Sequence, residues 1–132
     1  MVDTSATAKA RILVVDDSSL VRLYYRSTLE KAGFHVEQAI NGIEAIEKVL
    51  SEQFDLVIVD VNMPRMDGFT FLRSLRCRAA DVATLPALMI STESGIQDIA
   101  EARASGANFY LVKPVAEADL VRHVCVLTGA SP

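Results

Sequence analysis

The chain has little of what marks a secreted, membrane-spanning or zinc-binding protein. Its two cysteines, Cys77 and Cys125, form no CxxC pair and match no zinc-ligand spacing. No apolar run approaches the roughly 18 residues of a membrane span. The start of the chain also lacks the apolar stretch of a secretory signal. We therefore expect a reduced, cytoplasmic protein that does not insert into a membrane.

An excess of positive charge is also lacking. The chain has 13 lysine and arginine residues against 17 aspartate and glutamate residues, which gives a net charge of −4 at pH 7. A basic surface that binds nucleic acid is therefore not expected. A DNA-binding output is not expected either, since only residues 130–132 follow Gly129.

Length and composition indicate one folded domain. Hydrophobic residues make up 51% of the chain and charged residues 23%, which excludes wholesale disorder. A chain of 132 residues has room for one domain and not two. We expect this domain at residues 9–129, with a flexible N-terminal tail at 1–8 and a C-terminal tail at 130–132.

Short apolar runs alternate with amphipathic segments along the chain. The apolar runs predict five strands, at residues 12–15, 35–39, 56–59, 87–90 and 108–112. The amphipathic segments predict five helices, at about residues 18–31, 43–50, 69–78, 96–105 and 116–127. Asn41-Gly42 reads as a turn, and residues 62–68 as a loop. This alternation implies a parallel sheet, and the uninterrupted apolar strands imply that helices cover both of its faces. The sequence thus predicts a doubly wound α/β domain.

Four of the five predicted strands end at a charged or hydroxyl side chain. Asp16 and Asp17 follow the first strand, Asp60 the third, Ser91 the fourth and Lys113 the fifth. In open α/β sheets, ligands bind at the carboxyl ends of the strands, so these residues can share one pocket. Three crowded carboxylates are tolerable when a hard cation such as Mg²⁺ joins them. The lysine and the hydroxyl would complete a cradle for a phosphoryl group.

These motifs resemble the receiver domains of two-component response regulators, and in particular the single-domain chemotaxis type. The motifs that carry the resemblance are Val-Val-Asp16-Asp17-Ser, Val59-Asp60-Val-Asn62-Met63-Pro64-Arg-Met66-Asp67-Gly68, Ile90-Ser91 and Gly106-Ala-Asn-Phe-Tyr110-Leu-Val-Lys113-Pro114. The resemblance covers about residues 9–129, nearly the whole chain, so this range would be the receiver domain. The resemblance implies the flavodoxin-like strand order 2-1-3-4-5, for which the chemotaxis response regulator is a standard example.

The resemblance also implies a chemistry and a metal. Asp60 would accept a phosphoryl group from a sensor histidine kinase, a phosphotransfer protein or a small phosphodonor, giving an acyl phosphate that water later hydrolyses. Asp17, Asp60 and the backbone carbonyl of Asn62 would ligate Mg²⁺, and Asp16 would act largely through a bound water. The chain would then be a signalling switch and not an enzyme, apart from its own phosphorylation and dephosphorylation.

Further roles and some departures follow from the same resemblance. Lys113 would contact the phosphoryl oxygens, and the Lys113-Pro114 bond that follows it would be cis. Ser91 would hydrogen-bond the same oxygens, and Tyr110 would be a rotameric switch. Ser91 stands where many members have threonine, and Thr92 where a smaller residue is common. Val115 replaces a frequent phenylalanine.

The resemblance places the output surface on the predicted helix 96–105, strand 108–112 and helix 116–127. The sequence adds that the last helix is apolar nearly all round, which is typical of a helix buried on two sides. Its core stripe is predicted at Leu120, Val124 and Leu127, and its outer apolar residues are Val121, Cys125 and Val126. Ile96 and Ile99 could extend that patch. It would be a groove for a downstream protein, a self-dimer surface, or a tolerated scatter of surface valines.

Strand order and right-handed crossovers predict the placement of the cysteines. The first and last helices would cover one face of the sheet, and the middle three helices the other. Cys77 and Cys125 would then lie on opposite sides of the sheet, too far apart for a disulfide.

Two other classes of function remain open. A Mg²⁺-dependent phosphatase of the haloacid-dehalogenase type also uses an aspartate at a strand end. That class needs a second acid two residues later, where this chain has Asn62, and it usually carries a cap domain. An unphosphorylated receiver-like scaffold is disfavoured, because all the chemical positions are filled.

Overall fold

The computed structural model describes residues 10–130. The predicted tail at residues 1–8 lies outside the described residues, as do residues 131–132 of the predicted C-terminal tail. No helix in the described part is both long and apolar enough to cross a bilayer.

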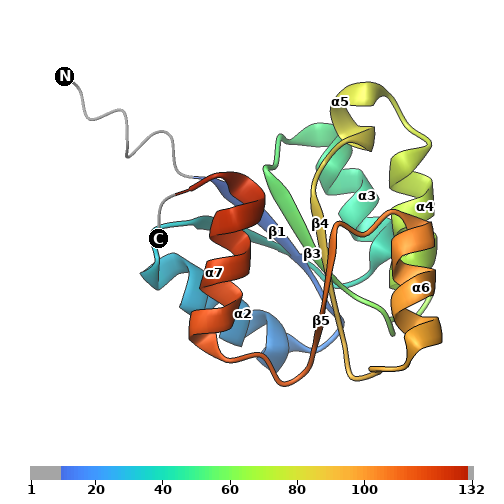
Figure 1. The fold of residues 1–132 in the computed structure, drawn as a ribbon. Helices are drawn as coiled ribbons and strands as arrows, with labels where there is room; N and C mark the ends of the chain where they lie inside the picture. The colour runs from blue at the N-terminus through green and yellow to red at the C-terminus, as the bar shows by residue number, and fades with distance from the viewer. Residues whose placement is uncertain (1–9, 131–132) are drawn as a thin grey trace.

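Five parallel strands form one sheet in the middle of the molecule (Figure 1). They are β1 (Arg11–Val15), β2 (His35–Ala39), β3 (Leu56–Asp60), β4 (Ala87–Ser91) and β5 (Phe109–Val112). Their order is β2-β1-β3-β4-β5, and every neighbouring pair is parallel. The predicted fold class and strand order are therefore confirmed.

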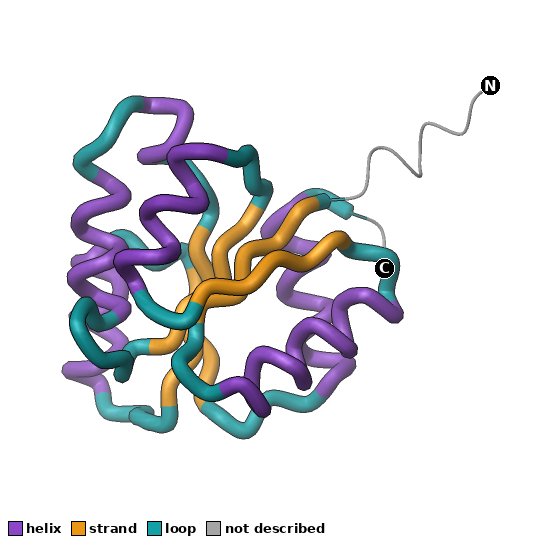
Figure 2. Tube along the Cα trace, turned by 180° about the vertical axis from the view of Figure 1, so that it is seen from behind, coloured by secondary structure: helices purple, strands orange, loops and turns teal. Residues whose placement is uncertain are grey.

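Helices cover both faces of the sheet, as Figures 1 and 2 show. They are α2 (Ser19–Lys31), α3 (Gly42–Ser51), α4 (Gly68–Arg76), α5 (Ala80–Ala83), α6 (Ile96–Ser105) and α7 (Glu117–Thr128). α2 and α7 lie on one face, and α3 to α6 lie on the other. The five predicted helices and all the strands match the observed bounds to within two residues.

Two apolar cores lie on the two faces of the sheet, because side chains alternate along each strand. In β1, Leu13 and Val15 pack with α3, α4 and α6. Ile12 and Val14 of the same strand pack with α2 and α7. Burial on both faces explains why the strand sequences are apolar without alternation.

The predicted separation of the cysteines is confirmed. Cys77 is exposed at the end of α4, Cys125 is buried in the core beneath α7, and both are free thiols.

The structure corrects two local predictions and adds one short helix that the sequence did not predict. Asn41-Gly42 is not a free turn, because the Asn41 side chain accepts a hydrogen bond from the Glu44 backbone N–H and caps α3, which begins at Gly42. α4 ends at Arg76 instead of continuing to about residue 78. The short helix α5 follows and was not predicted, because it buries no residue fully and so has no apolar periodicity to detect.

A further correction concerns the outer surface of α7. Cys125 is buried with Leu120 and Val124, whereas the predicted core residue Leu127 is only partly buried. Val121 also packs partly against this core. The apolar stripe of α7 is wide because the helix contacts both the sheet and α2.

Candidate functional site

Three carboxylates meet at the carboxyl ends of β1 and β3. Asp16 and Asp17 directly follow β1, and Asp60 is the last residue of β3, the strand beside it. One carboxylate oxygen from each residue lies within 4.8 Å of the other two. Asp16 and Asp60 are buried, whereas Asp17 is exposed at the mouth of the site. The predicted acidic cluster is thus assembled by adjacent strands.

Lys113 reaches into this cluster from the end of β5. Its Nζ lies 3.1 Å from Asp60 Oδ1 and 3.3 Å from Asp16 Oδ2. Its backbone N–H donates to the carbonyl of Ser91 at 2.8 Å, and the Lys113-Pro114 bond is cis, as predicted. The side chain of Lys113 is 20% exposed, so its ammonium bridges two buried carboxylates with little solvent around it.

The charges of the site are unbalanced. Burial and the charge of Asp16 raise the pKa of Asp60 above its usual range, and the contact with Lys113 offsets only part of this rise. Burial lowers the pKa of Lys113, but its contacts with Asp60 and Asp16 outweigh burial and raise that pKa overall. Lys113 therefore stays charged, whereas the folded site disfavours the ionised form of Asp60. A further cation would relieve this imbalance.

Ser91 and Tyr110 are linked through one backbone segment. Ser91 is fully buried at the end of β4, and its Oγ accepts a hydrogen bond from the Glu93 N–H at 3.1 Å. The Tyr110 hydroxyl donates to the carbonyl of Glu93 at 2.7 Å. Ser91 Oγ uses an acceptor lone pair in this contact, so its O–H remains available as a donor. The sequence predicted both side chains but not this connection.

The loop after β3 is fixed against the strand by Gly68. Its N–H donates to the Val61 carbonyl at 2.9 Å. A Cβ at this position would lie 2.4 Å from the Asp60 carbonyl oxygen, so a larger residue cannot take this place without a shift. Asp67 caps α4 by accepting from the Thr70 N–H. Asn62 is exposed at the start of this loop, two residues after Asp60, and its role as a metal ligand stays a prediction.

Two contacts from α2 to the site were missed at the sequence level. Arg22 donates to the backbone carbonyl of Asp16, and the hydroxyl of Tyr24 donates to the backbone carbonyl of Val115. Both acceptors are main-chain atoms, which every residue has, so no motif reveals them.

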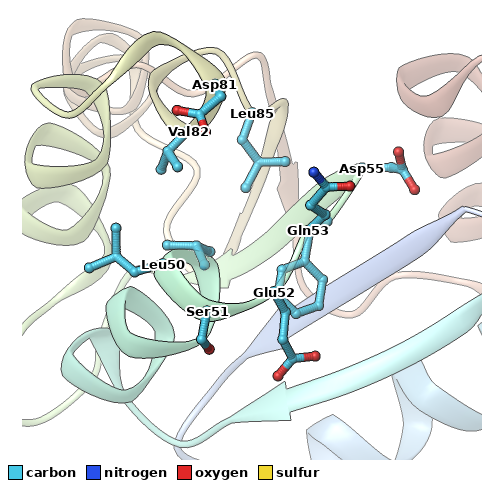
Figure 3. Close-up of a pocket in the computed structure, with 10 residues that line it drawn as sticks. Leu50, Ser51, Glu52, Gln53, Asp55, Asp81, Val82 and Leu85 are labelled. Atoms are coloured by element: carbon cyan, nitrogen blue, oxygen red, sulfur yellow. The ribbon is translucent and has the colours of Figure 1, made fainter.

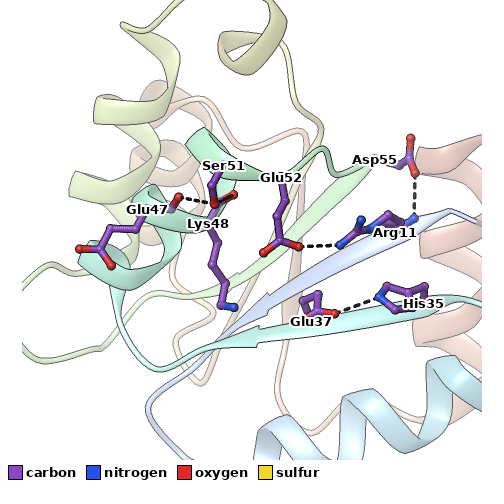
Figure 4. A network of polar contacts seen from close by, with 8 residues as sticks. All are labelled: Arg11, His35, Glu37, Glu47, Lys48, Ser51, Glu52 and Asp55. Carbon is purple, nitrogen blue, oxygen red and sulfur yellow. Dashed lines mark hydrogen bonds and ion pairs between the residues drawn. The ribbon is translucent and has the colours of Figure 1, made fainter.

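A separate pocket of about 380 Å³ lies at the opposite, amino-terminal end of the strands (Figure 3). It is bounded by the end of α3, the loop before β3, and α5, and includes the acidic residues Glu52, Asp55 and Asp81. Figure 4 shows that Arg11 holds two of these acids. Its Nη2 lies 2.7 Å from Glu52 Oε1, and its backbone N–H donates to Asp55 Oδ2 at 2.8 Å. These contacts join the start of β1 to the loop before β3.

Comparisons with known proteins agree with this geometry. The family model described as response regulator receiver domain matches residues 12–125. The chain is 37% identical over 125 residues to the transcriptional regulatory protein PrrA of Mycobacterium bovis, covering 95% of this chain and 52% of PrrA. PrrA of Mycobacterium leprae is 36% identical over 123 residues, covering 93% of this chain and 52% of that protein. The chain thus spans about half the length of these curated relatives.

Solved structures show the same similarity. Chemotaxis response regulator CheY4 of Vibrio cholerae is 38% identical, with a TM-score of 0.86 over 91% of this chain and 99% of that one. A putative response regulator from Chloroflexus aurantiacus is 31% identical, with a TM-score of 0.87 over 92% of this chain and 98% of that one.

Proposed function

Because this chain belongs to the family of response regulator receiver domains, we propose that it is a phosphorylation-controlled switch with Asp60 as the phosphoryl acceptor. One observation carries this proposal: Lys113 Nζ lies between Asp60 and Asp16, beside a third carboxylate at the same edge of the sheet. This arrangement offers a carboxylate nucleophile next to a fixed cation, which is what phosphoryl transfer to a side chain needs.

The residues of this site fit Mg²⁺. Asp16, Asp17 and Asp60 would hold it, with the backbone carbonyl of Asn62 as the further proposed ligand. Hard carboxylate and carbonyl oxygens suit this ion. Burial and Asp16 raise the pKa of Asp60, and a bound cation would favour its ionised form. When bound, Mg²⁺ supplies charge neutralisation for the carboxylates and the incoming phosphoryl oxygens.

The side chains of the chain itself would carry the reaction. A carboxylate oxygen of Asp60 forms a bond to phosphorus while the bond from phosphorus to the donor breaks, which is a P–N bond when the donor is a phosphohistidine. The electron pair of that bond leaves with the donor. Lys113 holds the equatorial oxygens as charge shifts between donor and acceptor. The free O–H of Ser91 donates to one of these oxygens in the acyl phosphate product.

Phosphorylation would reach the surface through Glu93. When Ser91 turns its hydroxyl toward a phosphoryl group, its contact with the Glu93 N–H changes, and Tyr110 is bound to the carbonyl of that same residue. Tyr110 lies on β5, between α6 and α7 in Figure 1. The proposed output surface is therefore the α6–β5–α7 face, defined by the exposed apolar residues Ile96, Ile99, Phe109, Val112 and Val126.

We propose that this face binds a partner protein or a second copy of the chain. Ile96 and Val126 are its most exposed members, at 87% and 72%. The phosphoryl donor is proposed to be a sensor histidine kinase or a phosphotransfer protein of the cytoplasm. The chain turns over no substrate other than its own phosphoryl group. The dehalogenase-type alternative has no support at Asn62, which cannot supply the second acid of that class.

The test is intact mass after incubation with a small phosphodonor. We expect a phosphoryl adduct with Mg²⁺ present, and its loss with a chelator or in the Asp60→Asn variant. Glu47→Gln, which removes an exposed acid on α3, is the matched control and should leave the adduct unchanged. An adduct that persists in Asp60→Asn would contradict the assignment of the acceptor.

A further inference from the structure

The side chain of Arg22 joins the ends of two strands. Arg22 lies in the first turns of α2, and its Nη1 donates to the backbone carbonyl of Asp16 at 2.6 Å. Its Nε donates to Gln38 Oε1 at 2.9 Å, on the neighbouring strand β2. A guanidinium has five N–H donors in a rigid plane, so two contacts in different directions fix its orientation.

The carbonyl that Arg22 holds belongs to the peptide between Asp16 and Asp17. The rest of Asp16 is also anchored: its N–H donates to the Ala39 carbonyl at 3.2 Å, and its Oδ1 accepts from the Ser18 N–H at 2.9 Å. The carboxylate of Asp17, in contrast, is exposed and makes no hydrogen bond or ion pair within residues 10–130. Its position is therefore set by the backbone that carries it.

We propose that Arg22 is a positioning residue for the metal site. It would orient the Asp16–Asp17 peptide and so hold the Asp17 carboxylate where a divalent cation can bind it, while Gln38 holds Arg22. This inference rests on the proposed role of Asp17 as a Mg²⁺ ligand. Groups that orient metal ligands contribute about 10- to 100-fold to metal affinity in other sites.

The charge of Arg22 has the opposite effect from its positioning role. A fixed positive charge beside the cluster repels an incoming cation, so its removal would strengthen Mg²⁺ binding if charge were the dominant effect. Removal weakens binding if positioning dominates. Our proposal predicts the second result, so the sign of the change in affinity separates the two.

The experiment measures the Mg²⁺ dissociation constant by calorimetry, with no phosphodonor present. We expect Arg22→Met to raise this constant about 10-fold. Arg22→Lys keeps the charge but cannot hold Asp16 and Gln38 together, so it should also weaken binding. Arg26→Met is the matched control: Arg26 lies one turn later on α2 and pairs with Glu30 on the surface, so its loss should leave the constant unchanged.

Unfolding of the metal-free variants separates positioning from general stability. A merely structural Arg22 would change the free energy of unfolding and leave the Mg²⁺ constant of the folded protein unchanged. If Arg22→Met does not fold, Gln38→Met decides, since it removes one contact of Arg22 and should weaken Mg²⁺ binding by up to about 10-fold.

Three outcomes would overturn the inference. The first is unchanged or tighter Mg²⁺ binding in Arg22→Met, or in Gln38→Met if Arg22→Met does not fold. This result contradicts the inference and leaves the proposed function standing, because the wild-type protein still binds Mg²⁺. An equal loss of affinity in Arg26→Met contradicts it too. Failure of the wild-type protein to bind Mg²⁺ contradicts the proposed function and this inference together.

Discussion

Replacing Lys113 with methionine should destabilise the metal-free protein by about 3 kcal/mol. Its ammonium lies 3.1 Å from Asp60 and 3.3 Å from Asp16, and both carboxylates are buried. Removing one partner of a buried ion pair typically costs about 3–5 kcal/mol, because an unpaired charge remains buried. We take the lower end because the side chain of Lys113 is 20% exposed. Methionine keeps the length of the apolar stem, so packing changes little.

The assay is chemical denaturation in a chelator and again in Mg²⁺. The loss should be smaller in Mg²⁺, because the variant lacks the ammonium that repels the ion and so binds it more tightly than the wild type does; bound ion adds about 2.7 kcal/mol at a hundred times its dissociation constant. Lys31→Met is the matched control. Lys31 pairs with Glu117 on the surface, where both side chains are more than half exposed, so its loss should change stability by less than about 0.5 kcal/mol.

The pH dependence of this effect has a defined sign. The pKa of Asp60 is raised in the folded protein by burial and by Asp16, so the folded state binds the proton more tightly than the unfolded state. Lowering the pH from neutral through that raised pKa therefore removes the repulsion, and the stability deficit of Lys113→Met should shrink as the pH falls. Adding Asp60→Asn to the Lys113→Met variant should likewise restore much of the stability that this variant loses at neutral pH. Equal deficits for Lys113→Met and Lys31→Met, or a deficit that grows as the pH falls, would refute this reasoning.

Three further substitutions test separate parts of the structure. Gly68→Ala places a Cβ 2.4 Å from the Asp60 carbonyl, so we expect a loss of about 1–3 kcal/mol by denaturation and weaker Mg²⁺ binding by calorimetry; unchanged values would contradict the fixed loop. Arg76→Met leaves the partly buried backbone oxygens of Gly106, Ala83 and Leu85 without their donor, so stability should fall by at least about 2 kcal/mol, and an effect below that would show that water replaces the guanidinium. Val126→Lys should change stability by less than about 0.5 kcal/mol, because the side chain is exposed, yet weaken self-association or partner binding by the phosphorylated protein in sedimentation; intact binding would exclude this part of the α6–β5–α7 face.

Much of the site could be predicted from the sequence because parallel strands end at one edge of the sheet. Asp16, Asp60, Ser91 and Lys113 each stand at or directly after the end of an apolar run, and the topology of the fold then brings them together. The strands themselves were readable because burial on both faces leaves them almost wholly apolar.

The features that were missed involve main-chain atoms or short apolar segments. The link from Ser91 to Tyr110 passes through the N–H and carbonyl of Glu93, and no residue type marks it. The burial of Cys125 depended on how α7 lies against α2, which helical periodicity alone does not give. Helix α5 buries too little surface to leave a pattern.

The most direct test of the switch is a comparison of backbone amide NMR spectra before and after addition of a phosphodonor with Mg²⁺. We predict shifts at Asp60, at Ser91 and Glu93, and at Tyr110 on β5, with the same residues unchanged in Asp60→Asn. Shifts confined to the surroundings of Asp60, with Glu93 and Tyr110 unaffected in a fully phosphorylated protein, would contradict the proposed route from the acid cluster to the α6–β5–α7 face.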